Sequence, residues 1–390
     1  MTAIDLRPGA EATGSAVAAA LRTIDANIAE FGDRYPGDTT AHGRYGLRPA
    51  GGGLPEGANQ GWTTSFWPGM LWLAYELTGD ETYLRAATAH VRGFTDRVEG
   101  GIDVETHDLG FLYTLSCVLP WRTSADRTAR GAALAAADRL LTRVLEPAGI
   151  IQAWGDMSDP RQRGRTIIDS LMNTPLLFWA SETSGEPRYA EVARRHIAQL
   201  RDHILRPDDT TFHTFYWDPR TGEPLRGETE QGHSDESCWA RGQAWGIYGF
   251  ALNHRHTGDA SLLDASRRCA DYFLAHLPAD GVCYWDLEFT DGSGEPRDSS
   301  AAAIAASGLI ELADALPDGG ERYRAAAARI LGSLIERYST AGHPGSNALI
   351  LHGVYDKPKN VGVDEGNLWG DYFYLEALTR FARPDWPHHW

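Results

Sequence analysis

Helical periodicity recurs along the chain in paired segments that are separated by a short turn of glycine and an acidic residue. The turns are Gly79-Asp80, Gly185-Glu186 and Gly258-Asp259, and related turns occur within 123–130 and 318–325. Glycine is favoured at the left-handed position that ends a helix, and an acidic residue favours the N-terminus of the helix that follows. The pattern therefore predicts a series of helical hairpins.

The two helices of each predicted hairpin differ in their apolar surface. The segment before the turn is apolar on nearly every side, as a buried helix is, and the segment after it is amphipathic and rich in Ala and Arg, as a covering helix is. The predicted buried helices are 64–77, 108–119, 169–182, 240–254, 299–316 and 367–381, and the predicted covering helices are 15–30, 81–94, 126–145, 187–204, 260–277 and 321–338.

Six buried and six covering helices in alternation predict an all-α fold, an (α/α)6 barrel of six helical hairpins. A helical solenoid is the competing layout, but its inner helices need not be apolar on all sides. No Pro-, Gly- or Ser-rich linker divides the chain, so residues 1–390 are expected to form a single domain. Three polar segments, 31–61, 206–236 and 341–366, are long for connections in a compact domain, and such loops are usually functional.

Composition and charge restrict the partners. The 36 basic and 53 acidic residues give a net charge of −17, which argues against a nucleic-acid partner. No stretch approaches the roughly 18 apolar residues of a membrane span, and residues 1–9 lack the features of a secretory signal, so no membrane partner and a cytoplasmic location are expected. The 13 tryptophans, 15 tyrosines and 12 phenylalanines fill a core and can also line a cleft for sugar rings.

Polar and aromatic residues gather at the starts of the predicted inner helices. Inner helices of such a barrel run parallel, so these starts share one rim, where six positive helix ends favour an anionic ligand. The residues at the rim are Trp62, His107-Asp108, Asp169, 236–241, Asp298-Ser299 and 367–369.

Aspartate at a helix start is more often a cap than a catalyst. Asp298 precedes two serines and is best interpreted as a cap. Asp169 instead lies between Ile167-Ile168 and Leu171-Met172, and an apolar setting raises the pKa of a carboxyl group, as a general acid at neutral pH requires. Asp108 follows His107 in a more polar segment, where a carboxylate stays ionised. Two carboxyl groups in contrasting environments are typical of an acid and its supporting anion.

Other reactive groups give weaker signals. The sequence contains no HExxH motif, P-loop, GxSxG motif or dinucleotide fingerprint, so no cofactor and no metal are expected. The four cysteines form no CxxC pair and are interpreted as buried free thiols. His388-His389 lies in the C-terminal tail and is expected to be exposed to solvent.

Six motifs together resemble the unsaturated glucuronyl hydrolases of glycoside hydrolase family 88. The resemblance runs from Trp62 to about Leu378, in the order of the family. The motifs are GWTTSFWPGMLWLAYE (61–76), HDLGF (107–111), IIDSLMNTPLLFWAS (167–181), ESCWARGQAWGIYGFA (236–251), RDSSAAAIAASGL (297–309) and WGDYFYLEAL (369–378). The resemblance implies an (α/α)6 barrel that removes the Δ4,5-unsaturated uronic acid from the non-reducing end of lyase-generated oligosaccharides. It does so by hydrating the C4=C5 enol ether.

The resemblance also implies roles for individual residues. Asp169 matches the acid/base, and Asp108 matches the second essential aspartate, 61 residues earlier. Arg241 matches the cation that is expected to pair with the uronate carboxylate. The remaining matches to substrate-binding positions are Trp62, His107, Trp154, His213, Gln231, Trp239 and Trp245.

One segment departs from some members of the family. Members acting on sulfated glycosaminoglycan fragments carry Ser-x-x-Ser-x-Lys before the last helix, whereas this chain has His352-Gly353-Val354-Tyr355-Asp356-Lys357. Only Lys357 is kept as a substrate-binding candidate, so unsulfated or lightly sulfated fragments are favoured.

Three alternatives remain open at this stage. The first is an unsaturated rhamnogalacturonyl hydrolase acting on pectin fragments, and the second is a catalytically silent barrel that binds acidic oligosaccharides. The third, a sugar epimerase, would call for paired catalytic histidines at the rim, and none is evident. The expected partner is an unsaturated uronic-acid oligosaccharide, and the expected assembly is a monomer or a loose homodimer.

Overall fold

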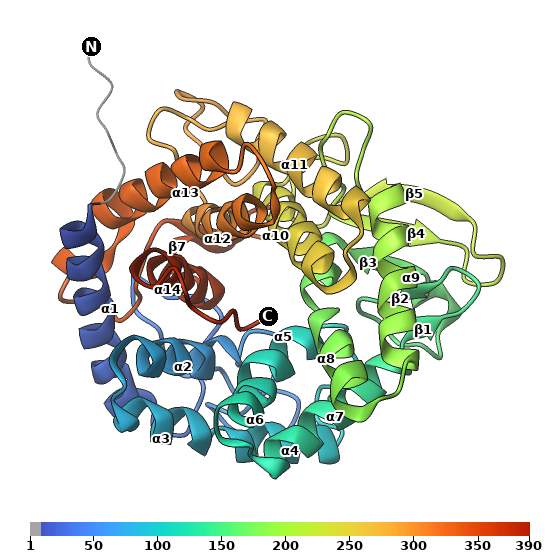
Figure 1. The fold of residues 1–390 in the computed structure, drawn as a ribbon, viewed down its shortest axis with the longest axis horizontal. Coiled ribbons are helices and arrows are strands. Elements are labelled where there is room, and N and C mark those ends of the chain that lie inside the picture. The colour runs from blue at the N-terminus through green and yellow to red at the C-terminus, as the bar shows by residue number, and fades with distance from the viewer. Residues whose placement is uncertain (1–8) are drawn as a thin grey trace.

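Two concentric rings of helices make up the computed structural model, which describes residues 9–390 (Figure 1). The absence of a secretory signal was inferred from residues 1–9, of which residues 1–8 lie outside the described part. The inner ring consists of α2 (Phe66–Thr78), α5 (Leu109–Tyr113) with η1 (Thr114–Val118) and α6 (Leu119–Ser124), η3 (Ile168–Met172) with α8 (Pro175–Ser184), α10 (Ala240–Thr257), α12 (Ser299–Ala315) and α14 (Leu368–Ala382).

The outer ring covers the inner one. It consists of α1 (Ala10–Phe31), α3 (Glu81–Ala89) with α4 (Val91–Glu99), α7 (Arg127–Leu141), α9 (Arg188–His203), α11 (Ala260–Ala275), and α13 (Glu321–Ser333) with η4 (Leu334–Tyr338). Helix α14 contacts α2, which closes the inner ring. The predicted all-α (α/α)6 barrel is confirmed.

The hairpin turns have the conformations that their residues favour. Gly79, Gly185 and Gly258 are left-handed, with φ values of 73°, 78° and 70°, and each ends an inner helix. Asp80 and Asp259 then accept hydrogen bonds from backbone N–H groups in the first turn of the next helix. Such a cap stabilises a helix by about 1 kcal/mol.

Two inner helices are interrupted. In the second, the π-helical turn η1 precedes Pro120, whose ring excludes a regular α-helical bond to the turn before it. In the third, Asp169 does not open an α-helix as expected. It lies in the 3-10 turn η3, and α8 begins six residues later at Pro175, a residue favoured in the first helical turn.

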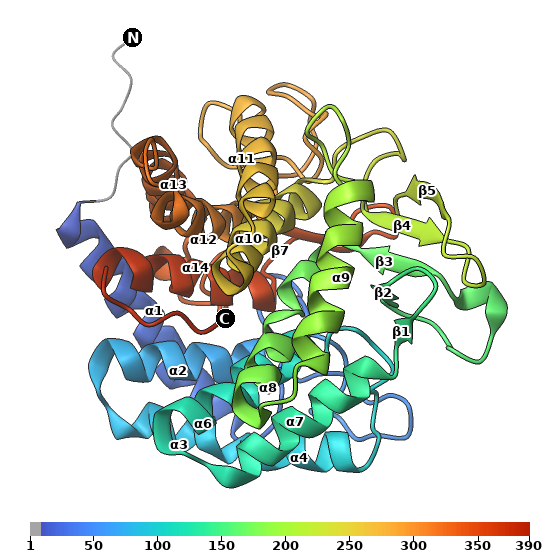
Figure 2. The same ribbon diagram turned by 45° about the vertical axis from the view of Figure 1, so that its right-hand side comes forward.

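The long loops carry small antiparallel sheets rather than barrel helices. Strand β1 (Val144–Leu145) pairs with β2 (Ile150–Ile151), and β4 (Thr214–Trp217) lies between β3 (Arg165–Ile167) and β5 (Pro224–Glu228). Strands β6 (Gly353–Asp356) and β7 (Val361–Glu365) form a hairpin before α14. Figure 2 shows β3, β4 and β5 at one side of the barrel. Two short 3-10 turns, η2 (Pro160–Gln162) and η5 (Thr340–Gly342), complete the loops.

The C-terminal tail lies inside the ring of helices, near its centre (Figure 1). Trp386 and Trp390 are 4% and 2% exposed, and His389 is buried with its Nε2 2.9 Å from Glu76 Oε2. His388 is partly buried and lies 3.3 Å from Glu311. The expectation of an exposed histidine pair is wrong, because partners from distant helices hold this tail.

The buried apolar side chains form one continuous cluster that extends from Ala16 to Trp390. This continuity supports the single-domain interpretation. Among the described residues, no helix combines the length and the apolar character that a bilayer crossing needs.

Candidate active site

A cavity of about 290 Å³ opens at the rim where the inner helices begin. Ten of the eleven residues that the sequence singled out line it. They are Trp62, His107, Asp108, Trp154, Asp169, His213, Gln231, Trp239, Arg241 and Trp245. The eleventh, Lys357, does not line the cavity, and its Nζ lies 3.7 Å from Glu295.

Two carboxyl groups and a histidine meet in this cavity. The buried His107 Nε2 lies 3.3 Å from Asp108 Oδ1 and 3.5 Å from Asp169 Oδ1. His107 Nδ1 is 2.9 Å from Ser170 Oγ, and its backbone N–H donates to Ala153. The imidazole is thus fixed between the two aspartates.

Neither aspartate caps a helix. Asp108 accepts a 2.7 Å hydrogen bond from Thr106 Oγ1 and makes no cap bond, and Asp169 Oδ1 is buried without a hydrogen-bond partner. Asp298, by contrast, accepts from the backbone of Ser300 and Ala301, as predicted. Of these three aspartates, the two whose side chains make no capping bond are the two that line the cavity.

Asp169 has the electrostatic setting of an acid. Burial raises the pKa of Asp169 well above its usual range, the negative charge of Asp108 raises it further, and Arg241 opposes both. A buried carboxyl group beside a carboxylate holds its proton near neutral pH. Burial also lowers the pKa of His107, so this imidazole is neutral there.

A close backbone approach brings the two aspartates together. Gly110, two residues after Asp108, packs against Asn173, four residues after Asp169. A Cβ at Gly110 would lie 2.2 Å from the Asn173 Cα. Phe111 N–H donates to Asn173 Oδ1 at 2.8 Å, which joins α5 to the turn after η3. Only glycine permits this contact.

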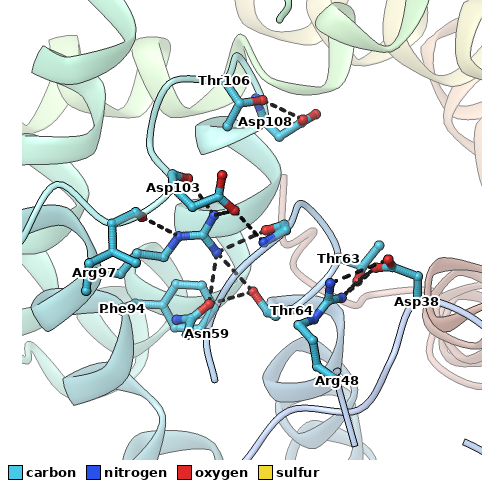
Figure 3. Close-up of polar contacts among 12 residues, drawn as sticks. Asp38, Arg48, Asn59, Thr63, Thr64, Phe94, Arg97, Asp103, Thr106 and Asp108 are labelled. Carbon is cyan, nitrogen blue, oxygen red and sulfur yellow. Dashed lines mark hydrogen bonds and ion pairs between the residues drawn. The ribbon is translucent and has the colours of Figure 1, made fainter. Parts of the chain in front are cut away.

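Two buried arginines hold Trp62 in place by binding its neighbours in the chain, Gly61 and Thr63. Arg97 donates to the backbone oxygen of Gly61 at 3.0 Å, and Arg48 donates to Thr63 Oγ1. Figure 3 shows Arg97 among Asn59, Thr64 and Asp103, and Arg48 beside Asp38 and Thr63. The Trp62 indole N–H donates to Tyr355 OH at 3.0 Å.

Arg241 joins three segments of the cavity wall by hydrogen bonds. Its Nη1 donates to Asp298 and to the backbone oxygen of Val354, and its Nη2 donates to Gln231 Oε1 and to the backbone oxygen of Tyr355. All four terminal N–H groups therefore have acceptors within the protein. The bidentate pair with a ligand carboxylate that the family resemblance suggested finds no free terminal N–H in this structure.

The loop side of the cavity is aromatic. The Arg241 guanidinium lies 4.4 Å from the ring of Trp239, which is 4.6 Å from the ring of His213. Burial and the positive charge of Arg241 lower the pKa of His213 to about 3. Its Nδ1 is 2.6 Å from Thr214 Oγ1, and its buried Nε2 has no partner. The Arg165 guanidinium covers the ring of Trp154 at 5.0 Å.

Four lining residues were not predicted from the sequence: Ile167, Glu230, Tyr355 and Lys359. Lys359 Nζ lies 2.9 Å from Asp356 and 3.9 Å from Glu230. Lys357 and Lys359 are the only lysines of the chain, and this was the one sequence feature that could have drawn attention to the hairpin as part of the site. The sequence could not tell which of them faces the cavity.

The same three side chains could share a cation. His107, Asp108 and Asp169 each offer one ligand atom, and these atoms lie within 4.8 Å of one another. Ligation would keep Asp169 ionised, because a carboxylate binds a metal in its deprotonated form. A metal there would therefore oppose an acid role for Asp169.

Comparisons with known proteins agree on one family. The model of Glycosyl Hydrolase Family 88 matches residues 48–378. The chain is 43% identical to the unsaturated chondroitin disaccharide hydrolase of Streptococcus pneumoniae, over 97% of this chain and 94% of that protein. It is 44% identical to the unsaturated glucuronyl hydrolase of Bacillus sp. (strain GL1), over 94% and 96% respectively.

Solved structures lead to the same family. The crystal structure of unsaturated glucuronyl hydrolase from Streptococcus agalactiae superposes with a TM-score of 0.93 at 44% identity, covering 98% of this chain and 95% of that one. A variant of that enzyme complexed with dGlcA-GalNAc6S superposes with a TM-score of 0.85 at 41% identity, covering 98% and 94%. With a family match over most of the chain and relatives at this identity, the protein belongs to glycoside hydrolase family 88.

Proposed function

We propose that this enzyme removes the Δ4,5-unsaturated uronic acid from the non-reducing end of lyase-generated glycosaminoglycan or related oligosaccharides, by hydrating the C4=C5 enol ether. The observation that carries the proposal is the Asp108–Asp169 pair, in which burial and a neighbouring carboxylate keep a proton on Asp169. The relatives that act on unsaturated chondroitin disaccharide, and the neighbouring structure with dGlcA-GalNAc6S, support the substrate class.

The proposed reaction begins with proton transfer from Asp169 to C4. Positive charge then develops at C5 and on the ring oxygen, and the negative charge of Asp108 stabilises it. The Asp169 carboxylate takes a proton from a water molecule, which adds its oxygen to C5. Asp169 thereby regains its proton, and one water has been added across the double bond.

Bond breaking between the sugars follows from this addition. C5 now carries a hydroxyl group and the ring oxygen, which is a hemiketal, and the ring opens to a ketone. C1 is left as a hemiacetal, which collapses and releases the second sugar. No covalent enzyme intermediate is needed, so the carboxylate separation that distinguishes retaining from inverting glycosidases does not apply.

We assign the sugar ring to the cavity's tryptophans and the carboxylate to Gln231 and His213. Gln231 Oε1 accepts from Arg241, which leaves the Gln231 amide N–H groups as donors. The neutral His213 donates through Nε2 when its Nδ1 accepts from Thr214. Arg241 supports this pair by orienting Gln231 and by its charge. Stacking of a flattened ring on indole supplies apolar contact.

The segment around Lys357 supports a preference for unsulfated or lightly sulfated fragments. Lys357 is paired with Glu295, and Lys359 lies between Asp356 and Glu230. Both lysines of this hairpin are thus paired with carboxylates. A sulfate group on the second sugar would meet acidic side chains as well as lysines.

The test follows the ultraviolet absorbance of the conjugated double bond in an unsaturated chondroitin or hyaluronan disaccharide. We expect the absorbance to fall as the second sugar is released. No loss with these substrates, but loss with a pectin-derived unsaturated disaccharide, would favour the rhamnogalacturonyl alternative. Binding of both without reaction would favour the silent barrel.

The pH profile provides a prediction about Asp108. Its negative charge raises the pKa of Asp169, so Asp108→Asn lowers that pKa, and the acid form is lost at a lower pH. We expect the basic limb of kcat/KM in the residual activity to shift by about 1–2 pH units toward acid, as a nearby unit charge implies. Glu230→Gln is the control, because Glu230 lines the cavity but does not shift the pKa of Asp169. An unshifted limb in Asp108→Asn would contradict the coupling.

The cytoplasmic location, the single domain and the monomeric or loosely dimeric state stay predictions. Cell fractionation and light scattering of the purified protein test the first and the last.

A further inference from the structure

We infer that Trp390, at the closed end of the barrel, is a positioning residue for the sugar-binding tryptophans at the open end. The inference rests on the proposed function, because Trp62 and Trp245 are assigned to substrate there. The carrying observation is a continuous aromatic contact from the C-terminal tail to the cavity wall.

The tail is anchored at the ends of the inner helices that lie away from the rim. Trp386 Nε1 and His389 Nε2 contact Glu76, near the end of α2. Arg122 donates to the His389 backbone oxygen at 3.0 Å, and Arg255 donates to that of Trp390 at 2.6 Å. These partners come from three different inner helices, so the tail has one defined position.

From this anchor the Trp390 side chain extends into the barrel. Its indole N–H donates to Glu376 Oε2 at 2.9 Å. Its ring stacks on Phe373, with centroids 6.0 Å apart and an interplanar angle of 12°. It also meets Phe111 edge-on at 5.8 Å. Aromatic pairs at these distances contribute about 0.5–1.5 kcal/mol each beyond the area they bury.

One aromatic layer separates Trp390 from the cavity. Phe111 lies 5.7 Å from Trp62 and 5.4 Å from Trp245, and Phe373 also lies 5.4 Å from Trp245. Both tryptophans line the cavity. Trp390 therefore packs against Phe111 and Phe373, which in turn pack against the tryptophans of the cavity wall. It does not line the cavity itself.

Removal of the Trp390 ring would leave a void behind Phe111 and Phe373. Neighbouring side chains relax partly into such a void, and misplacement by a fraction of an ångström weakens stacking. The carboxyl pair is held by backbone contacts rather than by the Phe111 ring: Gly110 packs against Asn173, and the Phe111 backbone N–H donates to Asn173 Oδ1. Loss of Trp390 should therefore affect substrate binding more than the chemical step.

The experiment compares Trp390→Ala, Trp390→Phe and Trp72→Ala by steady-state kinetics on an unsaturated chondroitin disaccharide and by thermal unfolding. Trp72 is the matched control, because it is a fully buried tryptophan of α2 that does not line the cavity, and its aromatic contact is with Tyr75 rather than with Phe111 or Phe373. We expect both alanine variants to lower Tm. Only Trp390→Ala should raise KM, about fivefold or more, with kcat within twofold, and Trp390→Phe should restore most of KM.

Two results would overturn the inference while leaving the proposed function intact: an unchanged KM in Trp390→Ala, or an equal rise of KM in Trp72→Ala. An inactive wild-type enzyme would instead reject the proposed function. In that case a crystal structure of the Trp390→Ala variant decides the inference by itself. Displaced Trp62 and Trp245 side chains support it, and unmoved ones refute it.

Discussion

Replacement of Asp169 by asparagine is expected to lower kcat by about 10²–10⁴-fold, the range that proton transfer by a positioned side chain contributes. Asparagine has nearly the same shape but cannot deliver a proton to C4 or take one from water. Because Asp169 Oδ1 has no hydrogen-bond partner in the protein and only a 3.5 Å contact with His107 Nε2, the substitution breaks no hydrogen bond at that atom. Stopped absorbance assays give kcat, and calorimetry with the unreacted disaccharide should show retained binding.

The control is Asp126→Asn on the outer helix α7. Asp126 caps that helix by accepting from Thr128 and Ala129, and it does not line the cavity. We expect a small loss of stability and an unchanged kcat. If Asp169→Asn retained more than about a tenth of wild-type kcat, Asp169 would not be the acid.

Gly110→Ala is expected to damage both the fold and the activity. The added Cβ would lie 2.2 Å, 2.3 Å and 2.6 Å from three backbone atoms of Asn173, and backbone cannot rotate away as a side-chain end can. Overpacking of this kind costs about 1–3 kcal/mol or more. Separation of α5 from η3 also moves Asp108 away from Asp169, and a shift near 1 Å can cost about 10²-fold in rate.

Gly131→Ala provides the comparison for that substitution. Gly131 lies inside α7, and a Cβ there meets no atom within 4 Å. Alanine at such a helical position stabilises by about 0.5–1 kcal/mol. Thermal unfolding and kcat/KM of both variants are measured together. Wild-type values for Gly110→Ala would show that the close approach is unnecessary for the site.

The barrel could be predicted because its signals are local. Each inner helix is apolar on nearly every side, and four of the five hairpin turns carry both a glycine and an acidic residue, so helix order and the shared rim follow from the sequence. The sequence also distinguishes the capping aspartate from the aspartate of the cavity. Asp298 precedes two serines and caps α12, whereas Asp169 lies among apolar residues and faces the cavity.

The remaining features depend on contacts between distant segments. The partners of His388 and His389 are Glu311 and Glu76, each more than 70 residues away, and no local pattern relates them. Lys359 rather than Lys357 lines the cavity because of the β6–β7 hairpin, whose pairing is irregular at Gly353. The acceptors around Arg241 come from three separate segments, so its engagement could not be foreseen either.

The buried tail also decides how an oligosaccharide can enter and leave. Trp390 and the aromatic layer above it fill the middle of the barrel behind the cavity, so the side chains there leave no continuation of the cavity toward the C-terminal tail. We therefore expect a terminal sugar, rather than a sugar inside a polymer, to reach the aspartates. After cleavage we expect the second sugar to depart first. The uronic acid product leaves last, and at high concentration it should compete with the next substrate for the same pocket.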